Sequence, residues 1–243
     1  MRISLDGQVA LVTGAGRGLG RAIALALAGA GAEVIAVART AADLDSLRHE
    51  GGALIRPMVA DVLDTTFYAE VEALERLDIL VNNAGGNKPM PMVEVDDETL
   101  DRLLALNIRS VYKTAQAAAR RMVAQGSGVI VNMSSQMGRV GSPRRTVYCL
   151  SKHAVEGLTK AMAVELAPNG VRVVSVAPTF VLTPMTEPMF ANPDFSAFVM
   201  DRIPMKKLAS VEDVANAVVF LASSAAGLIT GESLAIDGGW TAQ

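Results

Sequence analysis

Cysteine, histidine and aromatic residues are scarce in this chain of 243 residues. A single cysteine excludes an internal disulfide framework and fits a reducing compartment, so we expect a cytoplasmic protein. Only 4% of the residues are aromatic while 51% are apolar, so the core must be built from Ala, Val, Leu and Ile. The two histidines, His49 and His153, belong to no cluster of metal ligands, and we expect no metal site.

Runs of one charge and long hydrophobic runs are also missing. The net charge is −3 and no basic run stands out, which argues against a nucleic-acid partner. No apolar stretch of ~18 residues is free of charge, so we predict no membrane span. The first seven residues hold no apolar core of a signal peptide, and we expect none.

Short apolar segments alternate with helical patterns along the whole chain. The segments rich in β-branched residues are predicted to be strands: 9–12, 34–38, 53–59, 79–82, 129–133, 171–176 and 234–236. Helical patterns occupy 21–30, 44–50, 65–76, 97–125, 148–166 and 211–223. Apolar strands that alternate with helices are covered on both faces and joined by right-handed crossovers. We therefore predict one α/β domain, residues 1–243, with a doubly wound parallel sheet of seven strands.

One stretch, about residues 178–208, shows no regular pattern. It holds five prolines together with methionine and phenylalanine. Long segments of this kind are usually lids or binding loops. We expect a substrate lid at about 179–208.

A glycine-rich turn follows the first strand and opens the first helix: Thr13-Gly14-Ala15-Gly16-Arg17-Gly18-Leu19-Gly20. Its pattern is T-G-x-x-x-G-x-G and not G-x-G-x-x-G. Glycines let backbone N–H groups approach a pyrophosphate at a helix N-terminus, so the turn predicts a dinucleotide site. The alternative is a turn required only for close packing of the helix on the sheet.

The end of the second strand indicates which nucleotide binds. An NAD site usually has an acidic residue about 20 residues after the glycines, but this chain reads Val37-Ala38-Arg39-Thr40. Arg39, with Arg17 nearby, can instead grip a 2′-phosphate as a planar fork. We expect NADP(H), with NAD(H) as the open alternative. A further alternative is that both arginines are solvated surface residues.

Tyr148 and Lys152 stand four residues apart in a predicted helix and so share one face. A positive charge beside a phenol favours its phenolate, which makes the pair a device for moving a proton. Ser135 lies thirteen residues before Tyr148, at the carboxyl end of the fifth strand, where ligands bind in open α/β folds. Asn107 interrupts the apolar stripe of the long helix, where a polar side chain needs a partner. A core Asn that is bonded for structural reasons alone is the alternative.

These residues together resemble the short-chain dehydrogenase/reductase family, over essentially the whole chain. Asp61-Val62 resembles its adenine-contacting pair, and Asn82-Asn83-Ala84-Gly85 resembles the motif that ends its fourth strand. The resemblance implies a Rossmann fold and a catalytic tetrad of Asn107, Ser135, Tyr148 and Lys152. The implied cofactor contacts are Gly14, Gly16, Arg17, Gly18, Leu19, Gly20, Arg39, Asp61, Val62, Asn83, Ala84, Gly85, Tyr148, Lys152, Pro178, Val181 and Thr183. Thr179 departs from the family, which usually has Gly after that proline.

The resemblance implies hydride transfer between a nicotinamide and a secondary alcohol or ketone. Ser135 is expected to bond the substrate oxygen, and Tyr148 to act as general acid in reduction and general base in oxidation. Lys152 is expected to lower the pKa of Tyr148 and bind the nicotinamide ribose, and Asn107 to hold a water that relays the proton. A non-catalytic redox sensor that binds NADP(H) is the alternative, although it has no need of Tyr148 or Lys152. An epimerase would need a larger C-terminal substrate domain.

Three arginines follow Ser135 in the chain: Arg139, Arg144 and Arg145. Arginine suits the carboxylate of a sugar acid or other oxo acid, and we take Arg139, Arg145 and Met185 as candidate substrate contacts. Solvated loop arginines or subunit contacts are the alternative. Segments 146–168 and 176–186 also resemble family members that oxidise sugar acids. A sugar acid, a polyol or another hydroxy or oxo compound is therefore the expected substrate.

Helices 97–125 and 148–166 predict self-association, because they carry small or apolar residues on more than one face. These residues include Ala115, Ala117, Ala118, Ala119, Ala161 and Ala163. One face packs on the sheet, and the rest suits a symmetric helix-pair interface. Trp240 is expected to be exposed, where a second interface buries it. With the family resemblance, these features predict a homotetramer.

Overall fold

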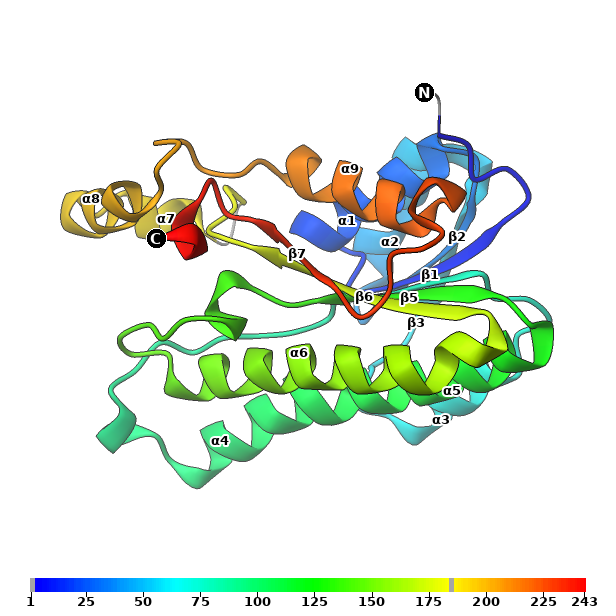
Figure 1. Ribbon diagram of the computed structural model, residues 1–243, viewed down its shortest axis with the longest axis horizontal. Coiled ribbons are helices and arrows are strands. Elements are labelled where there is room, and N and C mark those ends of the chain that lie inside the picture. Colours follow the sequence, from blue (N-terminus) through cyan, green and yellow to red (C-terminus); the bar gives the residue numbers. More distant parts are fainter. Residues whose placement is uncertain (1–2, 184–185) are drawn as a thin grey trace.

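The structure is a computed structural model that describes residues 3–183 and 186–243. Seven strands form one parallel sheet in the order β3-β2-β1-β4-β5-β6-β7 (Figure 1). They are β1 (Val9–Thr13), β2 (Glu33–Ala38), β3 (Ile55–Val59), β4 (Ile79–Asn82), β5 (Gly128–Met133), β6 (Val171–Pro178) and β7 (Ser233–Ile236). The predicted fold class is confirmed, and each strand begins and ends within two residues of its predicted bounds.

Helices cover both faces of the sheet (Figure 1). One face carries α1 (Gly18–Gly29), α2 (Ala41–Gly51) and α9 (Val211–Ala222), and the other carries α3 (Thr65–Glu72), α4 (Asp97–Leu104), α5 (Ser110–Gln125) and α6 (Thr146–Leu166). Alternate residues of a strand enter different apolar cores: Val12 packs under α1 and α9, while Leu11 packs under α3 and α5. The continuous apolar runs of the strands therefore reflect burial on both faces.

The predicted helix 97–125 is divided by a π-helical turn, Ala105–Arg109, between α4 and α5. No proline or glycine marks the interruption. Asn107 lies in this turn and is 1% exposed, and its side chain bonds the backbone of Gly86 in the loop after β4. A tertiary contact thus accompanies the irregular turn, and wider turns of this kind are frequent at functional sites.

The stretch predicted to be irregular contains two helices, α7 (Glu187–Phe190) and α8 (Pro193–Arg202), so that prediction is wrong for these residues. Proline is well tolerated in the first turn of a helix, where its missing N–H has no partner to lose. Asn192 caps α8 by accepting hydrogen bonds from the N–H groups of Asp194 and Phe195. Both helices lie beyond the carboxyl ends of β6 and β7, beside the C-terminus (Figure 1).

The alanines expected to form an external face are mostly internal. Ala115, Ala117, Ala118, Ala119 and Ala163 are buried in the core beneath α5 and α6, and only Ala161 of that set is exposed. Their small side chains let the helices lie close to the sheet. Trp240 is half-buried, with its ring 6.0 Å from that of Phe180, so the expectation of an exposed Trp is also wrong.

The strand order reverses between β1 and β4, which makes this the switch point where ligands bind in open α/β sheets. Thr13 ties the two strand ends together, because its hydroxyl accepts hydrogen bonds from the N–H groups of Asn83 and Ala84, both at 3.0 Å. Asn83 bonds the first strand end in turn, because its side-chain amide donates to the carbonyl oxygens of Thr13 at 2.9 Å and Gly14 at 3.2 Å. The glycine-rich turn is therefore braced against the loop after β4.

Candidate active site

A cavity of about 510 Å³ lies at this switch point. The glycine-rich turn, the ends of β2 and β3 and the loop after β4 line it, together with side chains of α4. The predicted cofactor contacts that line it are Gly14, Gly16, Arg17, Arg39, Asp61, Val62, Ala84 and Gly85. Ligand pockets typically measure ~300–1,000 Å³, so the cavity has the size and the walls that a nucleotide requires.

Two glycines of the turn serve different purposes. A Cβ at Gly20 would overlap the carbonyl oxygen of Gly14 and come within 2.5 Å of Asn83 Nδ2, so Gly20 is required for close packing. Gly18 has φ +53°, a conformation that strains any side chain, and an added Cβ would make ordinary contact with Thr183 at 3.9 Å. Packing therefore accounts for Gly20, whereas the positive φ accounts for Gly18 at the start of α1.

The other predicted cofactor contacts surround this turn and the end of β6. Leu19 packs on the core beneath α1, and Val181 is buried and bridges to Ala209. The carbonyl of Pro178 lies 3.5 Å from Ser135 Oγ. Thr183 faces Gly18, which brings the loop after β6 to the glycine turn. Met185 lies outside the described residues.

The two predicted phosphate-binding arginines lie at the cavity, and both are exposed and paired with acids. Arg17 forms a fork on Asp43, with contacts of 2.8 and 3.3 Å. Arg39 lies 3.8 Å from Asp61. Asp43 could not be predicted as part of the site, because this acid comes from α2 and not from the end of β2. Only the fold brings its carboxylate to the cavity wall.

Asn107 uses its whole amide group within the protein. Its Oδ1 accepts from the N–H of Gly86 at 2.8 Å, and its Nδ2 donates to the carbonyl of Gly86 at 2.8 Å and to Ser151 Oγ at 3.2 Å. Both amide hydrogens are thereby occupied. These bonds fix the loop after β4 against α6. A water held by Asn107 must therefore donate its hydrogen bond to an oxygen of this residue.

Ser135 and Tyr148 meet beside this loop. Ser135 is buried, and its hydroxyl donates to Gln136 Oε1 at 3.0 Å while accepting from the N–H of Met137 at 3.2 Å. Burial raises the pKa of the half-buried Tyr148 phenol, while its hydrogen bond with Ser135 and the positive charge of Arg145 act in the opposite direction. The phenol therefore holds its proton at neutral pH.

Lys152 lies one turn further along α6, with Nζ 5.5 Å from the centre of the Tyr148 ring. It is buried, and Nζ donates to the carbonyl of Met133 at 2.7 Å. Burial lowers the pKa of Lys152 to about 8, although the negative charge of Glu156, one turn further along α6, raises it. Glu156 is itself buried and accepts from the hydroxyls of Ser175 and Ser233, both at 3.0 Å. The i, i+4 spacing of Lys152 and Glu156 was the only signal for this acid in the sequence.

The expected effect of Lys152 on the pKa of Tyr148 stays a prediction, because burial sets the direction of the shift in the protein alone. The phenol pKa is raised and not lowered, because burial outweighs the nearby positive charges. Of these charges, Arg145 lowers the pKa of Tyr148, while burial brings the pKa of Lys152 itself down to about 8. Sequence spacing showed that the two side chains share a face, but it carried no information on their burial.

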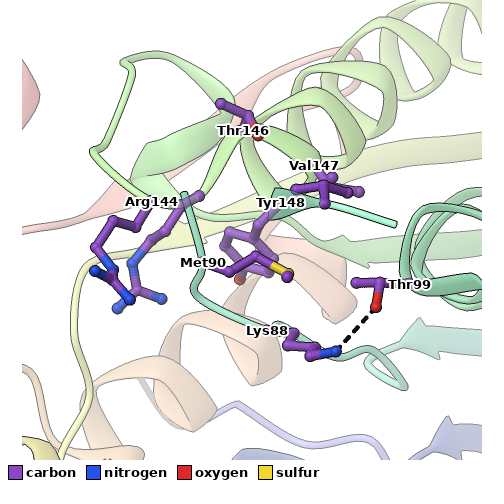
Figure 2. A pocket seen from close by; sticks show the side chains of 9 residues that line it. Lys88, Met90, Thr99, Arg144, Thr146, Val147 and Tyr148 are labelled. Carbon is purple, nitrogen blue, oxygen red and sulfur yellow. Dashed lines mark hydrogen bonds between the residues drawn. The ribbon is translucent and has the colours of Figure 1, made fainter. Parts of the chain in front are cut away.

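The candidate substrate arginines separate in the structure. Arg139 is exposed, donates to the carbonyl of Ser233 and does not line the small cavity beside Tyr148. Arg145 is 8% exposed and lines a small cavity of about 10 Å³ together with Tyr148 and Arg144. Figure 2 shows this cavity, where Lys88 and Met90 face the start of α6 and Lys88 Nζ donates to Thr99 Oγ1 at 2.9 Å. Of the two arginines proposed as substrate contacts, only Arg145 lies beside the phenol.

Within residues 3–183 and 186–243, no helix is long and apolar enough to cross a membrane. The same residues contain no group of three His, Cys, Asp or Glu side chains that could hold a metal ion.

A family model described as enoyl-(acyl carrier protein) reductase matches residues 14–241. The chain belongs to the short-chain dehydrogenase/reductase family. This confirms the resemblance drawn from the sequence and makes the chain a member of a family of NAD(P)-dependent oxidoreductases. L-Xylulose reductase from Bos taurus is 43% identical over 246 residues, which span 100% of both proteins.

Solved members of the short-chain dehydrogenase/reductase family share the fold over the full length. A gluconate 5-dehydrogenase from Burkholderia cenocepacia, in complex with NADP and tartrate, is 33% identical with a TM-score of 0.93, covering 100% of this chain and 98% of that one. A short-chain type dehydrogenase/reductase from Mycobacterium marinum is 37% identical with a TM-score of 0.92, covering 99% and 98%. Because the relatives carry different substrate names, family membership alone does not determine the substrate.

Proposed function

We propose that the protein transfers hydride reversibly between NADP(H) and a secondary alcohol or ketone of a small polyhydroxy compound. One observation carries this proposal: Ser135, Tyr148 and Lys152 converge next to the cavity at the switch point. Gly85 lines that cavity, and a Cβ added to Gly85 would lie 4.0 Å from Lys152 Nζ. A proton donor, a hydrogen-bond donor and a buried cation thus adjoin a nucleotide-sized space.

NADP(H), when bound, supplies or accepts the hydride at its nicotinamide ring. Ser135 donates a hydrogen bond to the substrate oxygen in place of Gln136 Oε1, and stabilises negative charge on that oxygen. Tyr148 gives its proton to the oxygen in reduction, and its phenolate removes the proton in oxidation. Lys152 contacts the nicotinamide ribose and stabilises the phenolate, while Asn107 holds the adjoining loop in place.

The preference for NADP(H) is supported by the two exposed arginines. Arg17 and Arg39 line the cavity with exposed side chains, and Arg39, which is only 3.8 Å from Asp61, can turn towards a 2′-phosphate. The Burkholderia cenocepacia relative was solved with NADP. Asp43 disfavours NADP(H), because its carboxylate lines the same cavity and would repel the 2′-phosphate unless Arg17 stays paired with it.

The substrate is placed between Tyr148 and the segment 179–208, which we propose to be the lid. Its aromatic side chains form a cluster in which Phe180 meets Phe190 and Phe195 edge-on, at 6.1 and 5.4 Å between ring centres. Trp240 of the C-terminal turn packs on the same Phe180 ring. Such a cluster gives the lid an apolar side and excludes water from the reacting oxygen.

The direct test is turnover by the purified protein. NADPH consumption with a panel of ketoses and keto acids, and NADP⁺ reduction with the matching polyols and hydroxy acids, should both be observed. A protein that binds NADPH tightly but converts no carbonyl and no alcohol would instead be a nucleotide-binding sensor, and the proposal would be wrong.

Replacing Arg39 with Asp should move cofactor preference towards NAD. The change removes a partner of the 2′-phosphate and supplies an acceptor for ribose hydroxyls. Loss of a charge-assisted hydrogen bond predicts that the NADP:NAD ratio of kcat/KM falls roughly 10- to 100-fold. Arg39→Ala is the control that removes the cation without adding the acid. A wild-type protein that already prefers NAD would show that our reading of Arg17 and Arg39 is wrong.

The protein is expected to be a homotetramer in solution. Large apolar side chains are exposed on α5 and α6, including Tyr112, Leu150 and Val164, with Val164 81% exposed. Exposed apolar residues on two neighbouring helices suit a symmetric helix-pair interface. Light scattering at micromolar concentration should give about four times the 25.4 kDa of one chain. A mass of one chain would refute the prediction, and a dimer would leave one of the two expected interfaces.

A further inference from the structure

Arg145 is a buried cation that lacks a counter-ion. It is 8% exposed, and no residue in 3–183 or 186–243 accepts a hydrogen bond or forms an ion pair with its guanidinium. Its contact is the face of Phe180, whose ring centre lies 5.4 Å from the guanidinium carbon. The stem of Arg145 is thus buried, its guanidinium has no acceptor among the described residues, and its N–H donors are available to a ligand with acceptor oxygens.

The backbone before Arg145 is held in an uncommon conformation. Arg144 has φ +61°, a left-handed conformation that residues other than glycine rarely adopt. The N–H of Met90 donates to the carbonyl of Arg144 at 2.9 Å and fixes this turn at the start of α6. Strained residues of this kind concentrate at ligand sites, where the surrounding structure holds them.

Arg145 is also close to the reacting groups. Its charge acts on the Tyr148 phenol, and both side chains line the small cavity of Figure 2. Ser135 is close enough to the phenol to lower its pKa, and the neighbouring Gln136 has a buried Nε2 with no hydrogen-bond partner in the described part of the chain. The surroundings of the phenol thus offer unused hydrogen-bond donors, which fits a ligand rich in acceptor oxygens.

We propose that Arg145 binds the carboxylate of the substrate, so that the substrates are polyhydroxy acid anions and not neutral sugars. A guanidinium can hold a carboxylate through two parallel hydrogen bonds, and the Phe180 ring supports its other face. The inference rests on the proposed oxidoreductase function and selects among its substrates. The Burkholderia cenocepacia relative was solved with tartrate, which is itself a hydroxy acid dianion.

Two pairs of compounds test the carboxylate alone. 5-Keto-D-gluconate and L-sorbose differ only in a carboxylate or a CH₂OH at one end, and D-gluconate and D-sorbitol differ in the same way. Wild-type protein should reduce the keto acid and oxidise the hydroxy acid with higher kcat/KM than their neutral counterparts. In Arg145→Met, kcat/KM for the acids should fall roughly 100-fold, mainly through KM, and change less than about threefold for the neutral pair.

Further variants separate binding from folding and from effects on the phenol. Arg145→Lys should recover part of the acid activity, because it keeps the charge but not the planar fork. Arg120→Met removes an exposed arginine of α5 that is paired with Glu72, and should behave like wild type. Tartrate should inhibit L-sorbose reduction competitively in wild type and at least tenfold more weakly in Arg145→Met. Retained L-sorbose activity shows that the variant folds.

Three outcomes would overturn the inference. One is wild-type protein that prefers the neutral compounds, and another is a lack of inhibition by tartrate. A third is an Arg145→Met variant that loses both classes equally with a displaced pH profile, because Arg145 would then act only on Tyr148. Absence of turnover with every compound and both cofactors would instead reject the proposed function itself.

Discussion

Tyr148→Phe should lose nearly all turnover and keep its affinity for NADPH. The phenyl ring fills the same space on α6, but the proton donor beside Ser135 is gone. Removal of a positioned acid or base typically costs ~10²–10⁴-fold in rate. Because burial raises the pKa of the phenol, wild-type reduction should not vary with pH across the neutral range. Steady-state kcat and the quenching or enhancement of NADPH fluorescence measure the two properties separately.

Tyr112→Phe provides the matched control for this variant. Tyr112 is 49% exposed on α5, and removal of its hydroxyl leaves the site untouched. Its turnover should equal that of wild type. If Tyr148→Phe stays within threefold of wild type, Tyr148 is not the acid or base.

Lys152→Met should damage both turnover and cofactor binding. It removes the ammonium beside the phenol, abolishes the 2.7 Å bond to the carbonyl of Met133 and leaves the Glu156 carboxylate without its nearby cation. We expect kcat to fall by about 10²-fold or more and the pH optimum for oxidation to move upward, since a phenolate without a cation forms at higher pH.

The lowered pKa of Lys152 predicts a second difference between wild type and this variant, in the pH dependence of NADPH affinity. A lysine with a pKa of about 8 is charged below that pH and neutral above it. Wild-type affinity for NADPH should therefore fall as the pH rises through about 8, whereas Lys152→Met should show no such fall. Lys160→Met, an exposed change two turns further along α6, is the control. Identical rate-against-pH curves for wild type and Lys152→Met would exclude the electrostatic role.

Features with a local signal could be predicted from the sequence. The strands, the glycine turn and the pairing of Tyr148 with Lys152 all follow from residue type and spacing, and the structure places them as expected. The start of α8 also had a signal, since Asn192 followed by proline and an acid is typical of a helix N-terminus. The number of prolines in that segment nevertheless led to the prediction of a loop.

Features that depend on long-range contacts could not be predicted. The π-helical turn coincides with the bonds between Asn107 and Gly86, and the pairing of Asp43 with Arg17 joins segments 26 residues apart. The i, i+4 spacing puts Glu156 beside Lys152, but the serines of β6 and β7 that bond its buried carboxylate come from distant parts of the chain. The direction of the Tyr148 pKa shift depends on burial, which the alternation of residues along one helix does not reveal.

Because the ends of β1 and β4 are bonded to each other, ligand binding costs less conformational entropy at the glycine turn than at the exposed arginines of the same cavity. Thr13 and Asn83 already immobilise the glycine turn through four hydrogen bonds, so a ligand seated there orders little further backbone. Arg17 and Arg39 are long, exposed side chains, and fixing such a side chain costs about 0.5–1.5 kcal/mol. Binding strength is therefore concentrated in the rigid turn, whereas discrimination between nucleotides depends on side chains that must still be ordered.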